Sequence, residues 1–181
     1  MLELRRNIAH LLLGTFFAFL AVSLPREFVL LTVAVVIGAL IVASFLHQRY
    51  EIPFLVWLFA RFDRPIKFTA KGAITFFVGI FIAVGLFSPL YAALSILVLS
   101  IADSLATIAG HYAGKHALFK MKTLEGTGTF FACAFVILVF FVTPAKAFLV
   151  ALIASVTELI TPAYVDDNIT VPFITGLLLS L

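Results

Sequence analysis

The sequence predicts an all-α integral membrane protein in which about seven helices form a polytopic transmembrane bundle. Of its 181 residues, 64% are hydrophobic and only 12% are charged, and the mean hydropathy is +1.21. Soluble domains are about half apolar and about a quarter charged, so this composition excludes a water-soluble fold. The apolar residues are gathered in seven runs, which cover residues 7–24, 28–46, 71–87, 90–112, 129–142, 146–161 and 169–181.

The runs predict helices joined by short connections within one domain. All seven prolines fall between runs or in the first turn of one, where proline disturbs a helix least. No linker or internal repeat divides the chain, so we interpret residues 1–181 as one integral membrane domain with a motif-rich catalytic core at about 71–181. Residues 47–70 mix charged and aromatic side chains. They fit an interfacial segment with a short helix over 53–62, and a plain extramembrane loop fits equally well.

The positive charges predict the orientation of this bundle. If the N-terminus is cytoplasmic, ten of the twelve Lys and Arg residues lie on the cytoplasmic side, and only Arg26 and Lys146 lie outside. The reverse orientation would invert this ratio. With seven spans the C-terminus lies outside, and the loops 113–128 and 162–168 are both cytoplasmic.

Three ionisable residues stand out inside predicted spans, where such groups are costly and usually functional. They are His10, Asp103 and Glu158, each in the cytoplasmic half of its helix. Helical spacing also places Ser100, Asp103 and Thr107 on one polar stripe. Hydrogen bonding between helices is the simpler explanation for the Ser and Thr residues. A lone carboxylate is poorly suited to holding helices together, so Asp103 and Glu158 are candidate catalytic residues. His10 is a third candidate.

The loop 110–128 suits a phosphorylated ligand. It combines glycines, whose backbone N–H groups can approach an anion, with lysines such as Lys115 and Lys122. A flexible basic loop at the membrane surface is the alternative interpretation. The loop contains no P-loop motif, so a P-loop fold is not implied.

A second loop suits a divalent cation. Residues 162–172 contain Asp166, Asp167 and Asn168, an oxygen-rich set of the kind that binds Mg²⁺. Capping of the following helix by Asp167 or Asn168 is the alternative, and it is compatible with either role. The residues alone therefore predict a membrane-embedded site, open to the cytoplasm, that binds a divalent ion and a phosphorylated small molecule.

Four motifs follow one another along the chain: RRNIAHLLLG, ADSLATIAGHYAGK, KTLEGTGTFF and ELITPAYVDDNITVP. Together they resemble the CTP-dependent lipid kinase family, which includes dolichol kinase, phytol kinase and a CTP-dependent diacylglycerol kinase and is related to the phosphatidate cytidylyltransferases. The resemblance is strongest over about 100–172. It implies that the γ-phosphate of CTP is transferred to the hydroxyl of a membrane lipid alcohol with Mg²⁺ or another divalent cation. A polyprenol or other isoprenoid alcohol is the first expected acceptor, and diacylglycerol is an alternative.

The resemblance also assigns expected roles to residues. The catalytic candidates are Asp103, Glu158 and His10. The candidates for binding CTP are Lys115, Lys122, Thr123, Glu125, Gly126, Gly128 and Asn168. The candidates for binding Mg²⁺ are Asp103, Glu125, Asp166 and Asp167.

The expected setting is a prokaryotic plasma membrane with the active site facing the cytoplasm. The expected partners are the lipid alcohol, CTP and the bilayer, with no nucleic acid; assembly into a homo-oligomer is compatible with the sequence. The closest rival function is that of a cytidylyltransferase making a CDP-lipid. A more distant rival is a small ion-coupled transporter, which would need polar residues along a continuous path across the membrane. The outer halves of the predicted spans are almost devoid of such residues.

Overall fold

The computed structural model describes residues 2–62, 69–119, 122–161 and 165–181. These residues are almost entirely helical, which confirms the all-α class. Parts of three expected segments, residues 63–68, 120–121 and 162–164, lie outside the described residues. In chain order the elements are α1 (Leu2–Ser23), α2 (Arg26–Arg49), α3 (Pro53–Phe62), α4 (Lys71–Leu86), α5 (Pro89–Leu97), the π-helical turn η1 (Val98–Ala102), α6 (Asp103–Ala113), β1 (Ala117–Phe119), β2 (Lys122–Thr123), α7 (Leu124–Val139), α8 (Pro144–Ile160) and α9 (Asp167–Ser180).

Within the part of the chain that the structure describes, three helical segments are long and apolar enough to cross a membrane. They are α1, α2 and the continuous helix formed by α5, η1 and α6, while α3, α4 and α7 are shorter apolar helices. The length and composition of these helices therefore permit a membrane protein. The arrangement with seven spans stays a prediction, as does the interfacial position of α3, although a helix does form at the residues expected for it.

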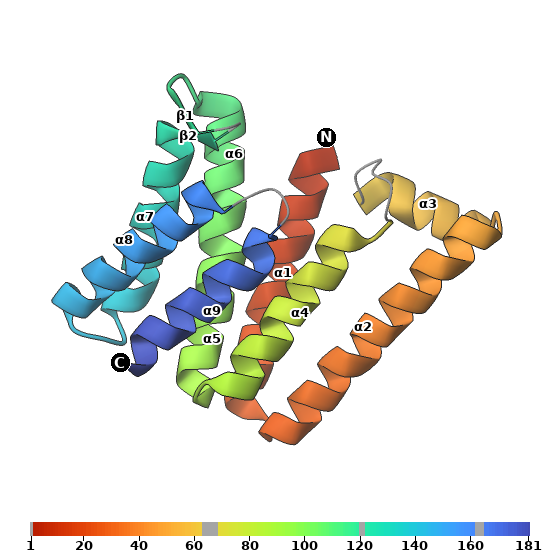
Figure 1. Cartoon of the computed structure of the whole chain (residues 1–181), viewed down its shortest axis with the longest axis horizontal. Coiled ribbons are helices and arrows are strands. Elements are labelled where there is room, and N and C mark those ends of the chain that lie inside the picture. The colour runs from red at the N-terminus through yellow and green to blue at the C-terminus, as the bar shows by residue number, and fades with distance from the viewer. Residues whose placement is uncertain (1, 63–68, 120–121, 162–164) are drawn as a thin grey trace.

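The helices run up and down between two ends of the bundle (Figure 1). One end carries the N-terminus, α3, the β1–β2 hairpin and the start of α9, and we call it the hairpin end. The other carries the C-terminus and the short α1–α2, α4–α5 and α7–α8 connections, and we call it the far end. Within the bundle, α1 packs on α5, α4 on α9, and α7 on both α6 and α8. All the loops predicted to be cytoplasmic therefore approach one end of the molecule wherever the structure describes them.

Apolar side chains occupy both the interior and the outer surface. Phe76, Ile80 and Phe130 are fully buried, whereas many large apolar residues remain exposed, such as Phe19 on α1 and Leu31 on α2. An exterior of this kind suits contact with lipid, because the bilayer does not drive apolar side chains inward as water does.

A π-helical turn interrupts the long helix directly before Asp103. The extra residue in such a turn shifts the helical register and often marks a functional position. Within η1, Ser100 is buried and donates a hydrogen bond to the carbonyl of Ile96 at 2.6 Å. A Cβ on Gly14 of α1 would lie only 1.6 Å from the Ser100 Oγ, so glycine is required for the close approach of α1 to η1. Nothing in the sequence pattern predicted this turn.

Pro172 lies inside a helix, which corrects the expectation that it falls in a first turn. Helix α9 begins at Asp167, ahead of the apolar run, so Pro172 is more than one turn from its start. Proline lacks an N–H group, and the carbonyl of Asn168, four residues earlier, therefore loses its usual helical donor. That carbonyl faces Gly79 of α4, where a Cβ would lie 2.0 Å from the oxygen. The absence of a side chain at Gly79 thus sets how closely α9 packs.

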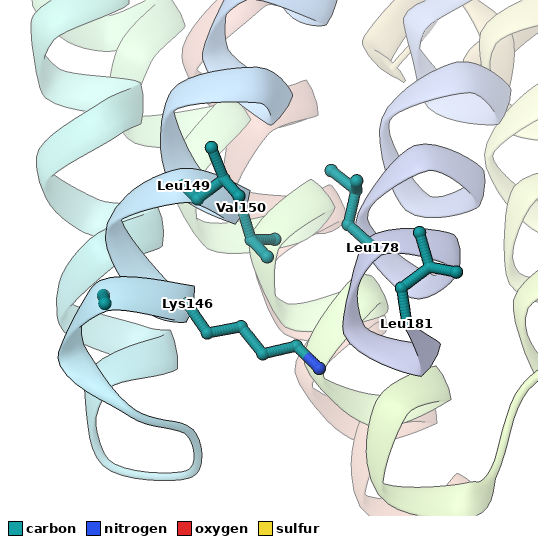
Figure 2. A pocket seen from close by; sticks show the side chains of 6 residues that line it. Lys146, Leu149, Val150, Leu178 and Leu181 are labelled. Atoms are coloured by element: carbon teal, nitrogen blue, oxygen red, sulfur yellow. The ribbon is translucent and has the colours of Figure 1, made fainter.

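The two basic residues expected on the outer side lie at the far end, and both bind helix-end carbonyls. Arg26 donates to the carbonyl of Phe87 at 2.5 Å, and Lys146 donates to that of Leu179 at 2.9 Å. Lys146 also borders a cavity of about 380 Å³ between α8 and the end of the chain, lined mainly by apolar side chains (Figure 2). This cavity lies at the opposite end from the residues described next.

Candidate functional site

Three carboxylates from separate parts of the chain converge at the hairpin end. Asp103 is the first residue of α6, Glu158 lies in the last turn of α8, and Asp167 is the first residue of α9. One oxygen of each lies within 4.8 Å of the others. We call Asp103, Glu158 and Asp167 the carboxylate cluster. Three negative groups this close repel one another, so the arrangement needs compensating positive charge.

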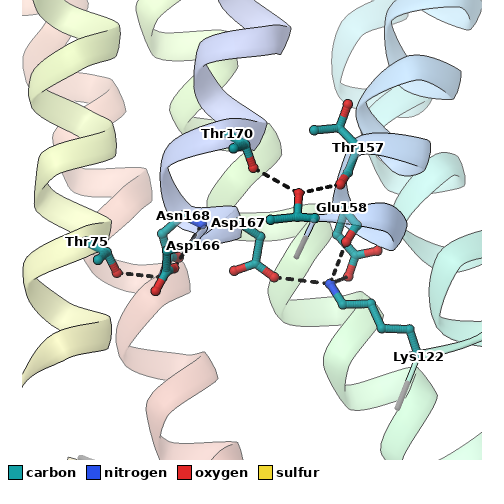
Figure 3. Close-up of polar contacts among 9 residues, drawn as sticks. Thr75, Lys122, Thr157, Glu158, Asp166, Asp167, Asn168 and Thr170 are labelled. Atoms are coloured by element: carbon teal, nitrogen blue, oxygen red, sulfur yellow. Dashed lines mark hydrogen bonds and ion pairs between the residues drawn. The ribbon is translucent and has the colours of Figure 1, made fainter. Parts of the chain in front are cut away.

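Lys122 of β2 supplies one positive charge to the carboxylate cluster (Figure 3). Its Nζ donates to a carboxylate oxygen of Glu158, to the Glu158 carbonyl at 2.9 Å and to the Asp167 Oδ2 at 3.1 Å. Burial alone would lower the pKa of this ammonium, but the charges of Asp167 and Glu158 outweigh it and raise the pKa above its ordinary value. Lys122 is therefore held fully charged among the carboxylates.

The donor set of the carboxylate cluster fits a hard divalent cation. Glu158 is only 5% exposed, and among the described residues its second oxygen, Oε2, is buried with no hydrogen-bond partner. Such an orphaned acceptor is costly unless a cation or donor satisfies it. Mg²⁺ is bound in proteins by carboxylate oxygens, usually together with substrate phosphates, and the cluster offers carboxylate oxygens of this kind.

Helix α1 brings two further ionisable residues near the cluster. The ring of His10 packs against that of Phe76 with centroids 4.4 Å apart, and His10 lies within electrostatic range of Asp167. The charge of Arg6 acts on Asp103 in the same way. Ser104 of α6 donates to the carbonyl of Asn7 at 3.1 Å and so ties α1 to the helix that carries Asp103.

The start of α9 is fixed by Asp166 and Asn168. The Asp166 Oδ1 accepts from the Asn168 backbone N–H at 3.2 Å and from its side-chain amide at 2.8 Å, so Asp166 is the capping residue that we expected in Asp167 or Asn168. The same amide lies 3.3 Å from the Thr75 Oγ1 on α4. With Asp166 occupied in this way, the Asp167 carboxylate is the one that turns to Lys122. The structure does not bring Asp166, an expected Mg²⁺ ligand, into the carboxylate cluster.

Glu125 is also engaged outside the carboxylate cluster. Its carboxylate accepts from the His116 backbone N–H at 3.3 Å and pairs with the His116 ring at 2.7 Å, across the two ends of the hairpin. The hydrogen bond from His116 lowers the pKa of Glu125 to about 2, so this carboxylate is ionised at any ordinary pH. Its observed role is to close the hairpin that holds Lys122, and not to join the other three carboxylates.

The remaining expected nucleotide-binding residues surround this hairpin. Thr123 caps α7 by accepting from the Gly126 N–H at 3.2 Å, and its side chain packs against Gly110 of α6. Lys115 is exposed, and a Cβ added at Gly128 would meet nothing within 4 Å. Thr123 and Gly126 therefore position the hairpin against α6, while Lys115 and Gly128 leave accessible surface around it.

Comparison with known proteins gives one relationship over the whole chain. The sequence is 35% identical over 183 residues to the uncharacterized protein MJ1137 of Methanocaldococcus jannaschii, and the alignment covers 99% of this chain and 94% of that protein. The chain belongs to the MJ1137 family. No protein-family model matches the chain, and no solved structure matches it. The MJ1137 relationship extends over the carboxylate cluster and the hairpin alike, and it states no activity, so the function is argued from the site.

Two features that hold the site residues in position in this MJ1137-family chain were not predicted from the sequence. Thr75, the partner of Asn168, lies within an apolar run and belongs to no motif, so nothing in the sequence indicated it. The β1–β2 pairing was also missed, because strands of three and two residues give no periodic pattern. The composition of the loop 110–128 had singled out Lys122, but only the hairpin explains how it reaches Glu158.

Proposed function

We propose that this protein is a divalent-cation-dependent kinase that transfers the γ-phosphate of CTP to the hydroxyl of a membrane lipid alcohol. The observation that supports it most is the convergence of Asp103, Glu158 and Asp167 with Lys122 at the hairpin end. Catalysis of phosphoryl transfer depends mainly on positioning and on neutralising charge, and this combination of groups can do both.

Each group has a definite task under this proposal. The carboxylate cluster would hold Mg²⁺, whose chemistry is to neutralise phosphate charge and to link the phosphates to the protein. Lys122 and the exposed Lys115 would bind phosphate oxygens as point charges. Asp103 would accept the proton of the lipid hydroxyl, since it lies on the helix that enters the apolar part of the bundle. His10, on the α1 side, would help to orient the acceptor.

The proposed donor and acceptor substrates are supported by different observations. CTP and an isoprenoid alcohol follow from the resemblance of the four motifs to CTP-dependent lipid kinases. A lipid acceptor is also favoured by the apolar exterior, because a long hydrocarbon chain could approach the hairpin end from within the bilayer. The Lys and Arg distribution favours an orientation with this end in the cytoplasm, and the proposed location is a prokaryotic plasma membrane.

The proposal is tested with purified protein in detergent, Mg²⁺ and CTP labelled at either the γ- or the α-phosphate. Each label is offered with a polyprenol, with phytol or geranylgeraniol, with diacylglycerol, and with the phosphate ester of each alcohol, and reactions without acceptor serve as controls. We expect the γ label to appear in the lipid fraction with one of these alcohols and the α label to stay in the water-soluble fraction. Transfer of the α label to a phosphorylated lipid would instead establish a cytidylyltransferase. Absence of both labels from every lipid would contradict both enzymes.

A further inference from the structure

Lys122 lies where a cation would lie in the carboxylate cluster. Its ammonium contacts Glu158 through both a carboxylate oxygen and the backbone carbonyl, and it reaches Asp167 at 3.1 Å. The charge of Asp103 acts on it as well. The oxygen atoms that surround Lys122 Nζ thus belong to the residues that form the candidate cation site.

Lys122 leaves the carboxylate cluster incompletely satisfied. One ammonium brings a single positive charge to three carboxylates, and the buried Glu158 Oε2 has no partner among the described residues. A divalent cation would bring twice the charge and could accept several oxygen ligands at once. Lysine carries its ammonium on a flexible four-carbon side chain. The ammonium of Lys122, on strand β2, can therefore leave the cluster by rotation about that side chain.

We propose that Lys122 is a tethered counter-ion, and that a divalent cation displaces it from the carboxylate cluster and frees its ammonium for a phosphate group. Occupation of the cluster by the cation and by Lys122 is mutually exclusive. The competition follows from the contacts alone, whereas the destination of the freed ammonium rests on the proposed function. The consequence is an ordered site, in which Lys122 becomes available to a nucleotide only when the cation is bound.

The test is Mn²⁺ binding to the nucleotide-free protein in detergent, measured by the electron paramagnetic resonance signal of the free ion. Lys122→Met removes the competing charge and keeps an apolar stem of similar length, and Lys115→Met is the matched control from the same loop. We expect Lys122→Met to bind Mn²⁺ at least about tenfold more tightly than the wild type, because a unit charge next to the ion has been removed. Lys115→Met should bind as the wild type does.

Thermal unfolding provides a second measurement that does not depend on catalysis. Without divalent ions, Lys122→Met should melt below the wild type, because its carboxylates lack a counter-ion, and Mn²⁺ should raise its melting temperature more than that of the wild type. Adding Glu158→Gln to Lys122→Met should abolish the extra gain, which locates the ion in the cluster.

Equal or weaker Mn²⁺ affinity in Lys122→Met would overturn the competition, and so would a gain that survives Glu158→Gln. These outcomes leave the labelled-CTP assay unaffected, so the inference and the proposed function can fail separately.

Discussion

Asp103 differs from the other acidic residues of the chain in its setting. It follows directly on the π-helical turn η1, lies in the carboxylate cluster and belongs to a helix long enough to cross a membrane. Its neighbours Glu158 and Asp167 repel its charge. A residue kept in an electrostatically unfavourable position is better explained by chemistry than by stability.

Asp103→Asn separates these two explanations. Under the proposed function the variant should lose at least about a hundredfold in phosphorylation rate, since a proton acceptor in the reaction typically contributes that much. It should melt at the same or a higher temperature than the wild type, because one of three mutually repelling charges is gone. Activity is measured by γ-label transfer and stability by thermal unfolding in detergent. Glu51→Gln, at an exposed carboxylate outside the cluster, is the control and should change neither.

At the residue scale, sequence reasoning singled out Asp103, Glu158, Asp167 and Lys122, and the structure brings them together. Buried charges are conspicuous in an apolar chain, which is why these could be found. The partner of each could not be predicted, since pairing depends on three-dimensional proximity. Glu125 is an example, because its hydrogen bond with the His116 ring depends on a hairpin that was not expected.

The position of helix α9 depends on a close contact between the carbonyl of Asn168 and Gly79 of α4. The missing N–H of Pro172 frees the carbonyl of Asn168, and Gly79 on α4 leaves room for that carbonyl. A Cα–H group of glycine is a weak donor to such an oxygen. The contact lies one residue from Asp167, so the packing of α4 against α9 also sets the position of one member of the carboxylate cluster.

Gly79→Ala should therefore disturb both stability and the site. The added methyl group would lie 2.0 Å from the Asn168 carbonyl oxygen, and α9 would have to shift. We expect a loss of about 1–3 kcal/mol in the free energy of unfolding, as for other overpacked contacts, together with reduced Mn²⁺ affinity. Gly72→Ala is the matched control on the same helix, because a Cβ there would meet nothing within 4 Å. Equal effects of the two substitutions would refute this role of Gly79.

At the element scale, each of the seven apolar runs corresponds to helical structure, and the short helix proposed over 53–62 is present as well. Hydrophobic runs and proline positions were enough for this. The π turn could not be predicted, because a register shift of one residue is decided by packing, here by the close approach of Gly14 to Ser100. The start of α9 was placed too late, since the polar capping residues preceding an apolar run belong to the helix but not to the run.

The whole molecule is polarised from end to end. The candidate carboxylate cluster and Lys122 lie at the hairpin end, while the basic residues of the far end, Arg26 and Lys146, bind helix-end carbonyls. These two exceptions to the charge asymmetry thus have a structural role of their own. Among the described residues, the remaining Lys and Arg residues lie on elements at the hairpin end and favour a cytoplasmic position for it.

This orientation predicts the labelling pattern of single cysteines. The chain has one cysteine, so Cys133→Ala gives a cysteine-free background into which Ala113→Cys at the hairpin end or Ala145→Cys at the far end is introduced. Both alanines are exposed. In intact cells a membrane-impermeant maleimide should label Ala145→Cys at once, and Ala113→Cys only after permeabilisation. The reverse pattern would place the carboxylate cluster outside the cell, away from CTP, and labelling of both in intact cells would contradict a bundle whose two ends lie on opposite sides of the membrane.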